Sequence, residues 1–108
     1  ASRFVRGGAK VALLDLASSA GAAEADRLGD AIFAPADVCD EDQVREAVDA
    51  TISKFGTLTT VVNCAGIAPP SRVLGKKGPH SLSQFQKVLE INCVGSFNVL
   101  RLAAEKMA

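Results

Sequence analysis

The sequence predicts an α/β fold in which helices cover a parallel β-sheet. Short, continuous apolar runs alternate with segments whose apolar residues recur at helical spacing. Such alternation is typical of parallel sheets, because a connection between parallel strands needs a crossover, usually a helix. The expected strands are residues 11–16, 31–38 and 57–63, and the expected helices are the opening residues up to Gly7, then 18–29, 40–56 and 81–108. We expect residues 1–108 to form one domain.

The first half of the chain contains two strand-like runs. The opening residues resemble the tail of a helix stopped by the glycine pair 7–8, because glycine accepts the left-handed backbone found past helix ends. Residues 11–16, VALLDL, form an apolar run of the kind found in strands buried on both faces. The alanine-rich stretch 18–29 favours a helix. Residues 31–38 form the second strand, which Pro35 interrupts.

The second half begins with the clearest helix, residues 40–56. Asp40 can cap this helix, and Gln43 occupies the reciprocal position of a capping box. Residues 57–63, TLTTVVN, form the third expected strand. Residues 64–80 contain three prolines and read as a long loop.

The last segment, residues 81–108, is expected to be one long helix. Ser81 and Gln84 form a second capping box at its start. Phe85 and Asn92 fall on its apolar face, so we expect the Asn92 amide to be buried and hydrogen-bonded. A glycine at position 95 weakens a helix and indicates a kink or close packing.

Composition excludes several classes of protein. Twelve basic and twelve acidic residues cancel, so nothing indicates a nucleic-acid or anionic-membrane partner. The apolar runs are too short to cross a bilayer. Cys39, Cys64 and Cys93 are widely spaced and odd in number, which favours reduced thiols in an intracellular compartment. No metal site is expected, because the only histidine, His80, has no ligand at metal spacing.

Candidate binding residues stand at the ends of the expected strands, where ligands bind in open parallel sheets. Asp15 ends the first strand and could accept hydrogen bonds from the ribose hydroxyls of a dinucleotide, or it could cap the next helix. Asp37 could accept from an adenine amino group while Val38 packs on the ring. Alternatively, Asp37 forms an Asx turn before the next helix.

The third strand ends in Asn63, Cys64, Ala65 and Gly66. The small residues permit a ribose or nicotinamide to approach the backbone closely, or they simply make a turn. Asn92 could hold a water or a carbonyl near this site, or it could be a satisfied core residue.

The run Asn63 to Gly66 resembles the N-N-A-G motif of the short-chain dehydrogenase/reductase family. Asp15, the pair 37–38 and the segment 90–98, EINCVGSFN, also fall where that family has them. The resemblance covers essentially the whole chain. It implies an NAD-dependent oxidoreductase that acts on a small-molecule alcohol, either a 3-hydroxyacyl-CoA or a hydroxysteroid-like compound, and that works in mitochondria.

The same resemblance implies a role for each candidate residue. Asp15 would bind the adenosine ribose of NAD, and Asp37 with Val38 would bind the adenine. Residues 64–66 would line the cofactor. Asn92 would be the asparagine of the catalytic tetrad, and helix 81–107 would contribute to the interface of a homo-oligomer.

Other parts of the family pattern do not occur in this sequence. It contains neither the glycine-rich loop nor the catalytic serine and Y-x-x-x-K pair, and it has no tyrosine at all. We therefore expect a processed chain, or a segment of a longer protein, that is inactive alone. It would hold strands 2 to 4 of a partial Rossmann-like, doubly wound parallel sheet whose central first strand is missing.

An open slot between two strands would make the chain poorly stable or force a rearranged sheet. The alternative is a non-catalytic short isoform that associates with full-length subunits through helix 81–107.

Overall fold

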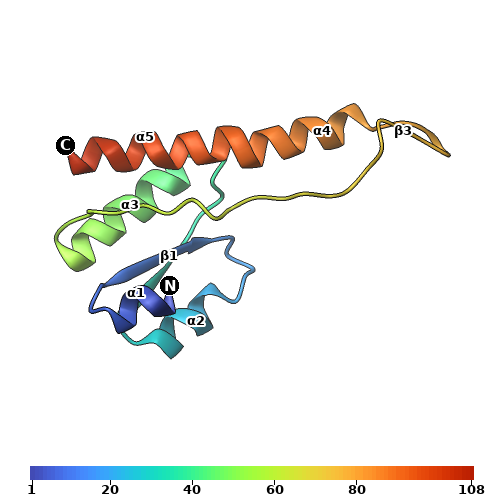
Figure 1. Cartoon of the computed structure of the whole chain (residues 1–108). Coiled ribbons are helices and arrows are strands. Elements are labelled where there is room, and N and C mark those ends of the chain that lie inside the picture. Colours follow the sequence, from blue (N-terminus) through green and yellow to red (C-terminus); the bar gives the residue numbers. More distant parts are fainter.

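The computed structural model describes all 108 residues, and its elements follow the expected alternation of helices and strands (Figure 1). In chain order they are α1 (Ser2–Arg6), β1 (Val11–Asp15), α2 (Gly21–Leu28), β2 (Ala31–Pro35), α3 (Glu41–Phe55), β3 (Leu74–Gly75), β4 (Gly78–Pro79), α4 (Leu82–Leu89), the π-helical segment η1 (Glu90–Gly95) and α5 (Ser96–Met107). No helix is both long enough and apolar enough to cross a membrane.

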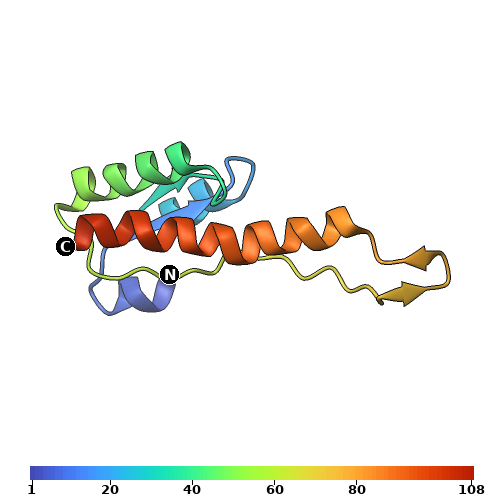
Figure 2. The ribbon, with the colours of Figure 1, turned by 90° about the horizontal axis from the view of Figure 1, so that it is seen from above.

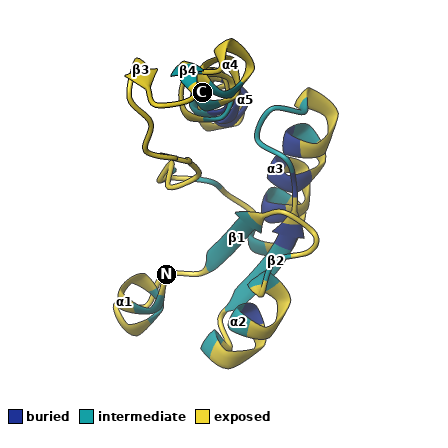
Figure 3. Cartoon of the chain, turned by 90° about the vertical axis from the view of Figure 1, so that its right-hand side faces the viewer, coloured by how far each residue is buried: buried dark blue, intermediate teal, exposed yellow.

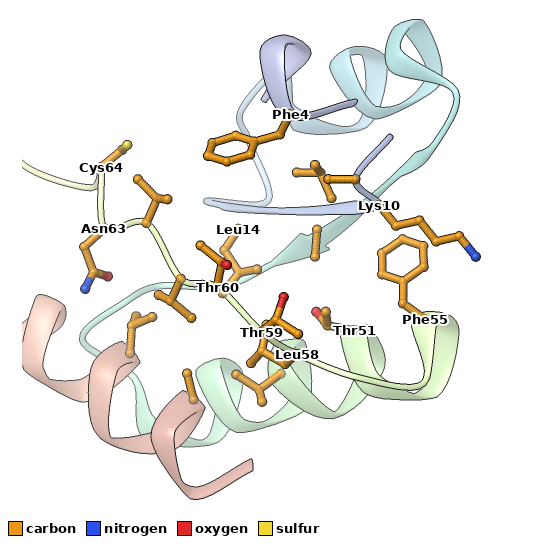
Figure 4. Close-up of a pocket in the computed structure, with 18 of the residues that line it drawn as sticks. Phe4, Lys10, Leu14, Thr51, Phe55, Leu58, Thr59, Thr60, Asn63 and Cys64 are labelled. Atoms are coloured by element: carbon orange, nitrogen blue, oxygen red, sulfur yellow. The ribbon is translucent and has the colours of Figure 1, made fainter. Parts of the chain in front are cut away.

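The body of the fold is a parallel pair of strands between helices. β1 pairs with β2 from Val11 opposite Ala31 to Asp15 opposite Pro35. Helices α1 and α2 lie on one side of the strands, while α3 and α5 lie on the other (Figures 1 and 4). The predicted α/β class is confirmed. β2 ends at Pro35, three residues before the predicted limit.

The prediction of a third strand at residues 57–63 is wrong. These residues form no strand, and residues 57–66 make no backbone–backbone hydrogen bond. A strand needs a hydrogen-bonded neighbour, and residues 57–63 have none. The only strand paired with β1 is β2. The edge of β1 that faces residues 57–63 therefore stays open, and the sheet does not close in a rearranged way.

The core lies where α3 faces α5 and β2 (Figure 3). Its main cluster consists of Val44, Val48, Val99 and Leu102, all buried. A second cluster of small residues, Ala34, Ala36 and Ala47, lets α3 approach the end of β2 closely. Only 12 of the 108 residues are buried, so the body is thin and much of the chain lies outside the core.

Polar contacts fix the start of α3 against α5. The amide of Gln43 donates to Asp40 Oδ1 at 3.0 Å, which confirms the predicted cap. Glu41 forms ion pairs with Arg45 at 3.0 Å and, across to α5, with Arg101 at 2.7 Å. The hydrogen bond from Arg101, followed by that from Arg45, lowers the pKa of the Glu41 carboxyl.

The expected single helix 81–108 is instead α4, η1 and α5 in succession. Ser81 caps α4 as predicted, through its hydroxyl and the amide of Gln84 at 3.3 Å. α4 and the small β3–β4 hairpin, which was not expected, project beyond the body (Figure 2). The side chain of Phe85 is consequently 53% exposed, so the apolar face of the helix is buried only in its second half.

Candidate functional site

The ends of β1 and β2 meet at one edge of the sheet, as expected. The backbone N–H of Ala36 donates to the carbonyl oxygen of Asp15 at 2.9 Å, which places Asp15 beside the residues that follow β2. Asp15 Oδ1 accepts from the amide of Leu16 at 2.8 Å. No side chain caps α2, so Asp15 is not the cap of the next helix. Its carboxylate is exposed, and Oδ2 has no partner in the chain.

Asp37 adopts the Asx turn that was one of its two predicted roles. Its Oδ1 accepts from the amide of Cys39 at 2.9 Å, and its own amide donates to Gln43 Oε1 at 2.9 Å. Burial, then the charges of Asp37 and Glu90, raises the pKa of the Cys39 thiol. The two hydrogen bonds of Asp37 hold the turn in place, while its Oδ2 atom remains free to accept a further hydrogen bond.

A cavity of about 570 Å³ brings four candidate residues together (Figure 4). Val38, Asn63, Cys64 and Ala65 all line it, although they come from segments 25 or more residues apart. Asn63 also donates from Nδ2 to the carbonyl oxygen of Ser96 at 3.3 Å. Gly66 and Asn92 lie outside the lining of this cavity.

Asn92 lies in η1 and clamps the loop after residue 66. Its Oδ1 accepts from the amide of Ile67 and its Nδ2 donates to the carbonyl oxygen of the same residue, both at 2.8 Å. The prediction that Asn92 is buried is wrong: Asn92 is exposed, although Gly95 of the same segment is buried against Val38. It does hold a carbonyl, as predicted. π-Helical turns are frequent at functional sites.

Gly66 gives a physical answer for the small residues after position 63. A Cβ at Gly66 would lie 3.2 Å from Asn92 Oδ1, tighter than ordinary van der Waals contact. The absence of a side chain therefore makes room for the Asn92 amide, which the sequence did not suggest. Whether Ala65 and Gly66 also admit a ligand stays a prediction.

Asn98, which the sequence analysis missed, ties the helix to the end of β2. It is 7% exposed; Nδ2 donates to the carbonyl oxygen of Val38 at 2.9 Å, and Oδ1 accepts from Arg101 Nη2 at 2.9 Å. Gly95 allows this approach, because its Cβ would meet Val38 Cγ2 at 2.5 Å. Its spacing in the sequence could have indicated this burial, because Asn98 lies three residues after Gly95 and four before Leu102, on the buried face of the helix.

Comparison with known proteins identifies the family. A family model described as enoyl-(acyl carrier protein) reductase matches residues 1–108. The chain belongs to the short-chain dehydrogenase/reductase family. The resemblance found in the sequence is thus confirmed, and the α/β fold with its small parallel sheet agrees with part of a Rossmann-like short-chain dehydrogenase.

Short-chain dehydrogenases similar to this chain carry the names of oxidoreductases. A human protein named 3-hydroxyacyl-CoA dehydrogenase type-2 is 48% identical over 110 residues, which cover 99% of this chain and 42% of the relative. The Drosophila melanogaster protein of the same name is 44% identical, with 99% and 43% coverage. A mouse L-fucose dehydrogenase is 35% identical, with 93% and 36% coverage. The chain spans less than half the length of these relatives.

The strand-end residues fit the adenosine half of the dinucleotide that the short-chain dehydrogenase family implies. Asp15 presents an exposed carboxylate oxygen with no partner in the chain, and Asp37 presents a second one from a rigid turn. An exposed carboxylate at the end of such a strand can accept from ribose hydroxyls, and its charge disfavours a 2′-phosphate. Val38 adds an apolar surface at the rim of the cavity.

Proposed function

We propose that this chain is the adenosine-binding part of an NAD-dependent short-chain dehydrogenase. The complete protein would transfer hydride between NAD and a 3-hydroxyacyl-CoA or a hydroxysteroid-like alcohol, and it would work in mitochondria. The observation that carries the proposal is the pair of free carboxylate oxygens, on Asp15 and Asp37, at adjoining strand ends. The name 3-hydroxyacyl-CoA dehydrogenase type-2, borne by several similar proteins, supports the substrate class.

Each residue has a separate task in this proposal. NAD, when bound, supplies the hydride acceptor. Asp15 accepts from the adenosine ribose hydroxyls, and Asp37 with Val38 accommodates the adenine. Cys64 and Ala65 offer a small, uncharged lining to the rest of the cofactor. Asn92 keeps the adjoining loop in place through its two hydrogen bonds to Ile67, and so acts as a positioning residue here.

The chain alone is proposed to be inactive in hydride transfer. An alcohol must lose its hydroxyl proton as hydride leaves carbon, so a positioned acid/base group is needed. The sequence contains no tyrosine, and its one histidine, His80, lies between β4 and α4 and not at the strand ends. Turnover of 3-hydroxybutyryl-CoA with NAD by the purified 108-residue chain would contradict this part of the proposal.

The cofactor assignment can be tested with the chain as it is. NAD and NADP are titrated into labelled chain, and amide chemical shifts are followed at residues 15 and 36–38. We expect NAD to shift these signals and NADP to do so more weakly, because the Asp15 charge repels the 2′-phosphate. Asp15→Asn should weaken NAD binding about tenfold or more, since a charge-assisted hydrogen bond is lost.

Asp26→Asn is the matched control for this titration. Asp26 is an exposed acid on α2 that makes no hydrogen bond or ion pair, and its replacement removes the same charge. Its variant should bind NAD as the parent chain does. Equal loss of binding in both variants would show that net charge, and not the Asp15 site, governs NAD affinity.

A second candidate function is association with another subunit through α4 and α5, including the non-catalytic pairing of a short form with full-length chains. Large apolar side chains stand exposed along these helices: Phe85 at 53%, Leu89 at 47%, Phe97 at 62% and Leu100 at 55%. Exposed apolar surface of this extent is typical of interfaces. The face suits a second copy, since two such helices can bury the same residues symmetrically.

Sedimentation of the chain over a range of concentrations tests this association. The parent chain should sediment as a dimer or larger assembly, and the double variant Phe97→Ser with Leu100→Ser should sediment as a monomer. Val73→Ser, which removes an 86% exposed apolar side chain from the region of the hairpin, is the control and should not change the assembly. A monomeric parent chain at all concentrations would rule out self-association through α5.

A further inference from the structure

The π-helical segment η1 contacts two parts of the candidate site that are far apart in the sequence. The turn at residues 37–39 packs against it, and the loop at residues 63–67 is bonded to Asn92 within it. We infer that Cys39 is a positioning residue, which holds η1 in the place from which Asn92 clamps Ile67. The turn and the loop are thereby coupled through η1.

The turn is joined to η1 by a thiol and by close packing. Cys39 Sγ donates to the carbonyl oxygen of Glu90, the first residue of η1, at 3.4 Å. At the other end of the segment, a Cβ added to Gly95 would lie 3.6 Å from Cys39 Sγ and 2.5 Å from Val38 Cγ2. Cys39 therefore lies beside both the first and the last residue of η1, and its contacts fix both ends of the segment.

The thiol suits this bond because it keeps its proton. Burial, and then the charges of Asp37 and Glu90, raises the pKa of the Cys39 thiol. A protonated thiol is a weak hydrogen-bond donor, and a backbone carbonyl oxygen can accept from it. The backbone amide of Cys39 donates in turn to Asp37 Oδ1 at 2.9 Å, so the turn itself keeps the thiol directed at η1.

Asn92 connects the same segment to the loop. It lies two residues after Glu90, and its side chain makes two hydrogen bonds of 2.8 Å with the backbone of Ile67. Its own carbonyl oxygen accepts from Ser96 Oγ at 2.8 Å, and Asn63 Nδ2 donates to the carbonyl oxygen of Ser96 at 3.3 Å. The loop is thus bonded at both of its ends to η1 and to the residue that follows it, so a shift of η1 would disturb both bonds.

These contacts give Cys39 a task within the proposed function. Asp37 and Val38, which are proposed to meet the adenine, directly precede Cys39. The loop at residues 63–67 is proposed to line the rest of the cofactor, and packed, hydrogen-bonded contacts of this kind can carry coupling between two sites. The link to the cofactor rests on the proposed function, whereas the contacts between the turn, η1 and the loop do not.

The test measures hydrogen exchange of the Ile67 amide in the 108-residue chain without ligand. Cys39→Ala removes the donor to η1 and should accelerate this exchange about two- to fivefold, because a thiol donates only a weak hydrogen bond. Cys39→Ser keeps a donor and should restore most of the protection. Cys93→Ala removes an exposed thiol from η1 itself and is the matched control, which should leave the exchange unchanged.

A double variant separates positioning from a general loss of stability. Because Cys39 is inferred to act through Asn92, adding Cys39→Ala to Asn92→Ala should accelerate Ile67 exchange no further. Independent effects of the two substitutions, equal acceleration at the buried Val48, or unchanged exchange in Cys39→Ala would each overturn the inference.

A last measurement adds NAD at saturation. NAD should slow Ile67 exchange further in the parent chain, and Cys39→Ala should remove this effect. NAD that shifts the amide signals of residues 36–38 without changing Ile67 exchange would overturn the coupling between turn and loop. A chain that binds no NAD would contradict the proposed function alone, and the ligand-free exchange would still decide the role of Cys39.

Discussion

The contact between Asn92 and Ile67 allows a local prediction that does not depend on global stability. Among the backbone amides between Thr57 and Arg72, only that of Ile67 donates a hydrogen bond within the chain, and its acceptor is Asn92 Oδ1. In Asn92→Ala two hydrogen bonds of 2.8 Å are lost. Each is worth about 0.5–1.5 kcal/mol net, and the exposed setting favours the lower end.

Together the two bonds should stabilise the closed loop by about 1–2 kcal/mol. Exchange of the Ile67 amide should therefore become roughly 5–30 times faster in Asn92→Ala. Hydrogen exchange followed by NMR measures this directly, with the buried Val48 of α3 as an internal reference that should not change. Asn92→Asp keeps an acceptor for the Ile67 amide and should retain part of the protection.

Two outcomes would refute this reasoning. Unchanged Ile67 exchange in Asn92→Ala would mean that the clamp does not hold the loop in solution. Equal acceleration at Val48 would mean that the substitution acts through global unfolding and not through the local contact.

Three further predictions concern the junction of α5 with α3 and β2. Asn98→Ala should lower the free energy of unfolding in urea by about 1–3 kcal/mol, because the carbonyl of Val38 loses its donor. Gly95→Ala should lower the free energy of unfolding by about 1–3 kcal/mol, because the new methyl group crowds Val38. Adding Val38→Ala should recover part of this loss, and purely additive effects of the two substitutions would contradict a contact between them. The pKa of Glu41 is lowered in the fold, mainly by the hydrogen bond from Arg101. Ionised Glu41 therefore stabilises the fold above the usual glutamate pKa, and this stabilisation is lost as the pH falls through the lowered pKa. Urea titrations at falling pH should show this loss, and Glu41→Gln should reduce it.

Local sequence signals were sufficient for most elements. Capping residues fixed the starts of two helices, since Asp40 and Ser81 accept from the amides that the capping boxes predict. Two apolar runs became β1 and β2, whose pairing places Asp15 beside the residues that follow β2. The candidate site could be predicted because the carboxyl ends of neighbouring parallel strands lie at the same edge of a sheet.

Other features depended on partners that are distant in sequence. Residues 57–63 have the composition of a strand, yet they form none, because pairing requires a neighbour that this chain does not place beside them. Asn92 was expected in the core from its helical spacing, but it is exposed in η1, where its side chain bonds to Ile67 of an exposed loop. Asn98 was overlooked because its importance comes from the carbonyl of Val38, 60 residues away.

The sequence by itself therefore determined the family, the α/β class, two helix starts and the position of Asp15 and Asp37 at adjoining strand ends. These follow from local propensity, capping and periodicity, which act over a few residues. The tertiary structure decided which of those residues are clamped, which asparagine is buried and where the sheet stays open. Those properties depend on pairing and packing between segments far apart in the chain, because a donor, an acceptor or an apolar face is satisfied only by what lies next to it in space.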